Sequence, residues 1–94
     1  MRVQRLIWLP DIVDKLESKH NVDQVEVEEV LFGQHYLRKV RRGYQPGEHV
    51  YAALGQTEAG RYLIVFFVLK VTGEALIISA RAMENDERRD YERR

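Results

Sequence analysis

The stretch RYLIVFFVLK, Arg61–Lys70, decides the fold class. It is rich in β-branched and aromatic residues, and its apolar side chains do not alternate with polar ones. Such a run is typical of a strand buried on both faces, so we predict that it lies in the middle of a sheet. Its apolar part, Tyr62–Leu69, is far shorter than the ~20 residues that a membrane helix needs. We therefore expect no membrane association.

Further strands are predicted on both sides of this stretch. They are separated by turn residues, which favours hairpins rather than long crossovers. The predicted strands are Val3–Trp8, His35–Arg41, His49–Gly55 and Ala75–Ala80. The predicted turns are Gly43–Gly47, Thr57–Gly60 and Thr72-Gly73.

Two helices are predicted between the first two strands. Asp11–Lys19 follows Pro10, and we expect Asp11 to be its N-cap. A capping box of Asp23 and Glu26 begins the second helix, and Gly33 ends it. The tail, Glu84–Arg94, is helical by charge spacing, because Glu84 with Arg88 and Asp90 with Arg94 are i,i+4 pairs. Its apolar face is thin, with Met83 and Tyr91 as its anchors, so we expect weak docking.

The predicted order is β-α-α-β-β-β-β-α. This is an α+β fold with a small, mostly antiparallel sheet, two N-terminal helices on one face and a C-terminal helix. The length of 94 residues predicts a single domain over residues 1–94. The chain has no cysteine, which is typical of a protein of the reducing cytoplasm.

The charges are balanced in number but not in position. Fifteen Lys and Arg oppose fifteen Asp and Glu, which argues weakly against a dedicated nucleic-acid binder. Seven acids lie between Asp11 and Glu29, whereas Arg38–Arg42 holds four bases and no acid. We expect a polyanion to meet the second stretch, and a cationic partner to meet the first.

Several kinds of site are not predicted. The three histidines have no ligand spacing and no cysteine supports them, so we expect no metal site and no cofactor. The glycines form no phosphate-binding loop, and neither Ser18 nor Ser79 lies in a nucleophile elbow. What remains is a set of cationic residues on and around the sheet.

Cationic residues of this kind suit RNA cleavage by attack of the 2′-oxygen. This reaction requires stabilisation of a pentavalent phosphate, for which the planar guanidinium is suited, and proton transfers to and from oxygen. Arg61 and Arg81 border apolar strands, so we expect a rigid position at the rim of the sheet and assign them to the phosphate. The alternative for Arg61 is a gatekeeper at a hairpin. The alternatives for Arg81 are a contact with the N-terminal cap of the last helix and an ion pair with Glu84.

Lys19 and His20 are the candidates for proton transfer, with compensation of the helix dipole as the alternative. The candidates for RNA binding are clustered near one turn. They are Tyr36, Arg38, Lys39, Arg41 and Arg42. The alternative is that their positive charge prevents an edge strand from pairing with another chain.

Phrases along the chain resemble one family of proteins. They are Lys19–Val22, Val27–Phe32, Gly47-Glu48, Ala53–Leu63, Ile77–Met83 and Glu87–Tyr91. In this order and spacing they resemble the BrnT family of bacterial type II toxins, from about Trp8 to the C-terminus. The resemblance implies a RelE-like fold and a ribonuclease that arrests translation. It strengthens the assignment of Lys19, His20, Arg61 and Arg81.

The resemblance also implies partners. We expect RNA as the substrate. We also expect a tight complex with a ribbon-helix-helix antitoxin similar to BrnA. The chain would contact operator DNA only through this antitoxin. A homodimer is a further expectation. The chain departs from the family where Leu76 replaces a common arginine, Ala82 a charged residue and Asn21 a glycine. A catalytically degenerate module that only holds the antitoxin is therefore the main alternative, and an unrelated interaction domain is another.

Overall fold

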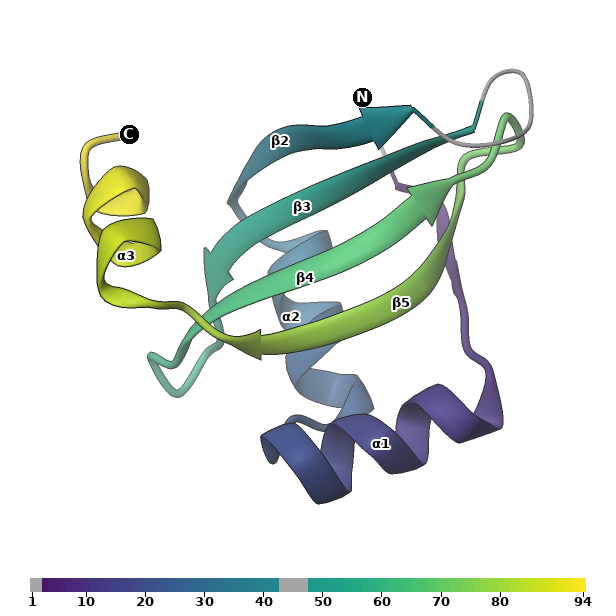
Figure 1. Cartoon of the computed structure of the whole chain (residues 1–94), viewed down its shortest axis with the longest axis horizontal. Helices are drawn as coiled ribbons and strands as arrows, with labels where there is room; N and C mark the ends of the chain where they lie inside the picture. Colours follow the sequence, from purple (N-terminus) through teal and green to yellow (C-terminus); the bar gives the residue numbers. More distant parts are fainter. Residues whose placement is uncertain (1–2, 43–47) are drawn as a thin grey trace.

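The computed structural model describes residues 3–42 and 48–94, with the backbone alone for Arg41 and Arg42 (Figure 1). The observed order confirms the predicted β-α-α-β-β-β-β-α fold. The predicted turn Gly43–Gly47 lies outside the described residues. The elements are β1 (Arg5–Ile7), α1 (Pro10–His20), α2 (Gln24–Phe32), β2 (His35–Arg42), β3 (His49–Gln56), β4 (Tyr62–Leu69), β5 (Glu74–Ala82) and α3 (Asn85–Glu92).

The five strands form one sheet in the order β1-β5-β4-β3-β2. The apolar strand β4 is its central strand, as its sequence predicts. The pairs β2·β3, β3·β4 and β4·β5 are antiparallel, whereas the short β1 runs parallel to β5. Strand β2 is therefore an edge of the sheet, which explains why its middle carries the charged pair Arg38 and Lys39.

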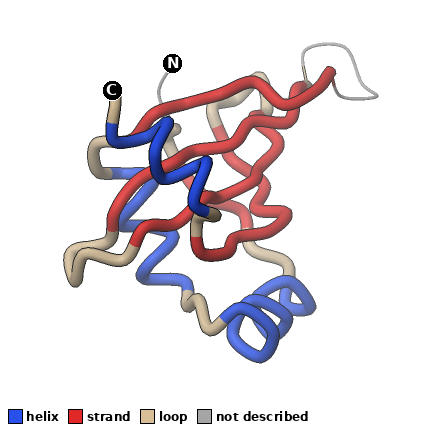
Figure 2. The backbone as a smooth tube through the Cα atoms, turned by 60° about the vertical axis from the view of Figure 1, so that its left-hand side comes forward, coloured by secondary structure: helices blue, strands red, loops and turns tan. Residues whose placement is uncertain are grey.

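The two faces of the sheet carry different helices. On the helix face, the side chains of Leu63, Val65 and Phe67 pack with Leu16 of α1 and Val30 of α2 in the main core. On the opposite face, which we call the α3 face, a smaller cluster is covered by Met83 and Tyr91. Its members are Ala52, Leu54 and Ile64. Figure 2 shows the helix next to the C-terminus lying over the strands, away from the helix pair that follows the N-terminus.

The start of α1 differs from the prediction. Leu9 is the N-cap and Pro10 the first helical residue, so the prediction of Asp11 as the N-cap is wrong. Proline suits this position because its ring fixes a helical φ and the missing N–H has no partner at a helix start. Asn21 ends the helix with φ 53°, a left-handed conformation that asparagine accepts more readily than most residues.

The boundaries of α2 are those that its sequence predicts. Asp23 and Glu26 form the capping box, with the Glu26 N–H donating to Asp23 at 2.9 Å. Gly33 is the C-cap, but with an extended backbone rather than a left-handed one. A Cβ at this glycine would lie 2.6 Å from the Glu29 carbonyl oxygen, so close approach is what requires glycine here.

Helix α3 docks on the sheet with no fully buried residue of its own, in agreement with its thin apolar face. The predicted pair of Asp90 and Arg94 is present at 3.3 Å. Arg88 pairs with Glu92 at 3.7 Å instead of with Glu84, whose backbone N–H donates a hydrogen bond to the Glu87 carboxylate. Among the residues that the structure describes, no helix is long and apolar enough to cross a membrane.

Candidate functional site

Arg61 precedes β4 and is held by the connection between the two N-terminal helices. One of its guanidinium nitrogens donates to the Asn21 carbonyl at 2.7 Å and to both Glu26 carboxylate oxygens at 2.7 and 2.9 Å. Its backbone N–H donates to the Thr57 hydroxyl at 3.0 Å. Arg61 therefore fastens the β3–β4 hairpin to the turn between α1 and α2.

The surroundings of Arg61 are acidic. A hollow of about 250 Å³ beside it is lined by Glu17, Asn21, Val22, Asp23, Glu26 and Arg61. Three carboxylates face one guanidinium that is already paired, so this hollow disfavours a phosphate. The bonds of Arg61 describe a structural clamp.

Lys19 and His20 lie in the last turn of α1, directly before Asn21. They therefore belong to the same side of the molecule as Arg61. Lys19 is exposed and His20 is half-buried. Their assignment to proton transfer stays a prediction, and this placement gives them no contact with Arg81.

Arg81 lies on the α3 face, where its strand neighbour is Ile64. Two guanidinium nitrogens donate to the two Glu87 oxygens at 2.8 and 2.9 Å, and the group lies 5.6 Å from the centre of the Phe66 ring. The prediction that Arg61 and Arg81 gather in one place is wrong. Arg61 binds Glu26 of α2, whereas Arg81 binds Glu87 of α3 on the opposite face of the sheet.

The ion pair of Arg81 and Glu87 shifts both groups toward their charged forms. The hydrogen bonds from Arg81 lower the pKa of Glu87 below its ordinary value of 4.5, and partial burial opposes this shift. The same bonds raise the pKa of Arg81. Only 13% of the Glu87 side chain is exposed, so the pair is well ordered and partly shielded from solvent.

Two more of the predicted RNA-binding residues share the face of Arg81. Tyr36, Leu54, Ile64 and Arg81 form one row across four strands, which places the backbones of Tyr36 and Arg81 about 14 Å apart. Arg38 lies in the next row, and its guanidinium is 3.8 Å from Asp90 of α3. These three side chains therefore lie on one surface.

The other RNA-binding candidates do not extend this surface in the same way. Lys39 is exposed and points to the helix face, opposite Tyr51, because side chains alternate along a strand. Arg41 and Arg42 belong to β2, and their side chains lie outside the described part of the chain.

Helix α3 and Arg94, which follows it, contact residues of the sheet. Glu87 binds Arg81, Asp90 lies near Arg38, and the Arg94 guanidinium lies 4.1 Å from the centre of the Tyr36 ring. The second and third of these contacts join residues that are distant in sequence. Spacing within the helix therefore gave no indication of them.

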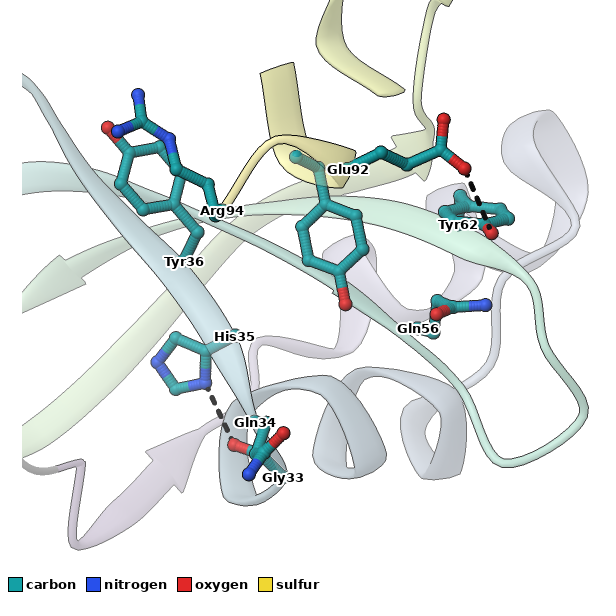
Figure 3. A pocket seen from close by; sticks show the side chains of 9 residues that line it. Gly33, Gln34, His35, Tyr36, Gln56, Tyr62, Glu92 and Arg94 are labelled. Carbon is teal, nitrogen blue, oxygen red and sulfur yellow. Dashed lines mark hydrogen bonds between the residues drawn. The ribbon is translucent and has the colours of Figure 1, made fainter. Parts of the chain in front are cut away.

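A second hollow lies between the C-terminal half of α3 and the ends of three strands (Figure 3). Its volume is about 780 Å³. It is lined by Gly33, Gln34, His35, Tyr36, Gln56, Tyr62, Tyr91, Glu92 and Arg94. Of these, only Tyr36 was predicted from the sequence as a candidate for RNA binding. The others come from four separate elements, so no sequence motif joins them.

The fold and this surface define a class of protein: a small α+β domain with a five-stranded sheet whose one face carries arginines and tyrosines beneath a C-terminal helix. A family model described as the ribonuclease toxin BrnT of a type II toxin–antitoxin system matches residues 8–87. The chain therefore belongs to the BrnT family of ribonuclease toxins. No curated protein matches the chain significantly.

Proposed function

We propose that this chain is an endoribonuclease that cleaves mRNA without a metal ion and so arrests translation in the cytoplasm. The family indicates a toxin of a type II system, and hence an RNA target and an antitoxin. The observation that carries the finer proposal is the pair of Arg81 and Glu87 on the α3 face. It combines a fixed positive charge with an ionised carboxylate at one point.

Arg81 retains donors for a phosphate while it holds Glu87. A guanidinium has five N–H groups. Two go to Glu87 and one to the Ala82 carbonyl at 3.2 Å. The Nε–H and one Nη2–H have no partner among the described residues. These two donors suit two oxygens of one phosphate, as in fork-like recognition.

Glu87 then lies beside the phosphate that Arg81 binds. Its lowered pKa keeps it ionised at neutral pH, which is the form that accepts a proton from a 2′-hydroxyl. The 2′-oxygen then bonds to phosphorus, the bond from phosphorus to the 5′-oxygen breaks, and the leaving 5′-oxygen takes a proton from water. The lowered pKa also weakens Glu87 as a base, so we assign most of the rate enhancement to Arg81. Arg38 and Tyr36 bind the flanking strand. Lys19, His20 and Arg61 take no step in this proposal, because they lie with the α1–α2 turn.

The proposed partner of the chain is a ribbon-helix-helix antitoxin that blocks this face or prevents RNA from reaching it. A cationic segment of such a partner also fits the acidic stretch between Asp11 and Glu29. Operator binding would then belong to the antitoxin.

The test is cleavage of a labelled RNA oligomer by the purified chain in the presence of EDTA. We expect products with 2′,3′-cyclic phosphate ends, and no cleavage of an oligomer with 2′-deoxyribose at the scissile position. Arg81→Ala should reduce the rate about 10²–10³-fold. Arg5→Ala, an exposed arginine that pairs with Glu74 on the far edge, should retain it. Metal-dependent cleavage, or equal loss in both variants, would contradict the proposal.

The alternative function is a binding module without catalysis. It is favoured by the acidic partners that already neutralise Arg81 and Arg38, and by Leu76 in place of the arginine common in the family. It predicts antitoxin binding and normal growth when the chain is produced alone. Growth arrest that Arg81→Ala relieves would exclude it.

A further inference from the structure

We infer that the hollow of about 780 Å³ beside α3 is a subsite for one nucleobase of an RNA strand. This inference rests on the proposed function and adds a second point of contact to it. The volume lies within the ~300–1,000 Å³ that small-molecule sites occupy, so a base with its ribose fits. The hollow is partly open, which a base that belongs to a continuous strand requires.

The walls of the hollow are aromatic. Tyr36, Tyr62 and Tyr91 come from β2, β4 and α3, and the rings of Tyr62 and Tyr91 meet edge to face with 6.0 Å between centres. Stacking on such rings is the main way in which proteins hold bases of single strands.

Arg88 of α3 and Arg94, which follows α3, each hold one of these rings. The Arg94 guanidinium lies 4.1 Å from the centre of Tyr36, and the Arg88 guanidinium lies 3.9 Å from the centre of Tyr62. A guanidinium in this position fixes the ring and adds positive charge beside it. The phosphates that flank a bound base would meet these charges.

The hollow also offers groups that read the edge of a base. The Gln56 amide nitrogen makes one long bond of 3.4 Å to the Gly60 carbonyl, and its oxygen has no partner among the described residues. The Tyr91 hydroxyl likewise has no hydrogen bond within the described part of the chain. Side-chain amides pair with bases through a donor and an acceptor together.

His35 adds an acceptor to the same lining. Its Nδ1 lies 3.0 Å from the Val30 carbonyl and 3.1 Å from the Gly33 carbonyl, and both oxygens can only accept. Nδ1 therefore carries the proton, and in the neutral ring Nε2 has a free lone pair. Figure 3 shows the hydrogen bond between His35 and Gly33, with Gln56 and Tyr62 on the other side of the view.

The position of the hollow agrees with a strand that reaches Arg81. Tyr36 stands in the same row of the sheet as Arg81, about 14 Å away. The middle of the row, Leu54 and Ile64, is buried beneath Met83 and Tyr91. An RNA strand that reaches both ends of the row must therefore pass around α3, with its base in the hollow a few nucleotides from the phosphate at Arg81. The subsite would thus select the sequence next to the cleaved bond.

The experiment is a titration of the full chain with AMP, UMP and ribose 5-phosphate, followed by NMR. We expect at least one nucleotide to bind at least tenfold more tightly than ribose 5-phosphate, and its binding to perturb Gln56 and the tyrosines. Gln56→Leu, at an exposed position, and Tyr62→Leu should each weaken that binding at least threefold. Arg5→Ala should leave it unchanged, because Arg5 is on the opposite edge of the sheet.

The outcomes separate this inference from the proposed function. Ribose 5-phosphate that binds as tightly as the nucleotides would overturn the subsite, because charge alone would then explain binding. Nucleotide affinity that survives Gln56→Leu and a folded Tyr62→Leu would also overturn it. Nucleotide binding without RNA cleavage supports the subsite and contradicts the nuclease. RNA cleavage without nucleotide binding supports the nuclease and contradicts the subsite.

Discussion

The guanidinium of Arg81 and the carboxylate of Glu87 form a two-pronged ion pair between β5 and α3, with distances of 2.8 and 2.9 Å. The pair fixes the start of α3, because the same carboxylate also accepts from the Glu84 backbone N–H at 2.8 Å. Helix α3 has no fully buried residue, so polar contacts carry much of its attachment. The pair therefore serves both the fold and the proposed chemistry.

Replacing Glu87 by Gln separates binding of RNA from its cleavage. Loss of one negative charge beside Arg81 should tighten RNA binding about two- to fivefold, the range of a partly exposed ion pair. Loss of the proton acceptor should lower the cleavage rate about 10²-fold or more. Binding is measured by fluorescence anisotropy with a 2′-deoxy oligomer, and cleavage in single-turnover reactions.

The control for this variant is Glu28→Gln, which removes the same charge from an exposed position on α2. It should change neither quantity. A cleavage rate that rises in Glu87→Gln would show that Glu87 only obstructs Arg81, and the proton acceptor would have to be found elsewhere.

Replacing Arg61 by Ala should affect stability rather than chemistry. The change leaves Glu26 and the Asn21 carbonyl without their shared donor, which should lower the free energy of unfolding by about 1–3 kcal/mol. The cleavage rate per folded molecule should remain. Urea unfolding and rates corrected for the folded fraction measure the two effects.

Arg93→Ala is the matched control for Arg61→Ala. Its side chain is 76% exposed and pairs only loosely with Asp90, at 3.7 Å, so its stability should change by less than about 0.5 kcal/mol. Complete loss of cleavage in a folded Arg61→Ala protein would show that Arg61 takes part in catalysis.

The fold was predictable because local signals agree with one another. The unbroken apolar run of β4 indicates a central strand, and the box of Asp23 and Glu26 indicates a helix start. The start of α1 was missed because proline and aspartate are both favoured near a helix N-terminus, and only the backbone angles of Leu9 separate the two cases.

The site was less predictable, since it depends on which face each side chain takes. Arg61 lies outside its strand by one residue, so alternation along β4 did not assign it to a face, whereas its bonds to Glu26 do. The hollow beside α3 was missed for a different reason. Gln56, Tyr62 and Tyr91 carry no motif and meet only when α3 folds back over the sheet.

Acid should loosen α3 through Glu87. The folded-state pKa of Glu87 is lowered by its bonds with Arg81, so its contribution to stability is present above about 4.5 and is lost as the pH falls through the lowered pKa. Unfolding by urea between pH 7 and pH 3 should show this loss in the native chain. Glu87→Gln should be less stable at pH 7 and should lose less stability on acidification. Equal slopes in the two proteins would contradict the prediction.

Replacing Leu76 by Arg tests whether the α3 face is the RNA surface. Leu76 is half-buried on β5 opposite Val68, on the same face as Arg81 by strand alternation and the bulge at Phe66 and Phe67. A cation there should contact one more phosphate of a bound strand. We expect tighter RNA binding and a salt dependence of log K that steepens by about 0.7, the value for one phosphate of a single strand. Leu76→Gln controls for loss of the apolar side chain, since it adds no charge. A slope that is the same in Leu76→Arg and Leu76→Gln would show that RNA binds another face, and Arg81 would then lose its assignment.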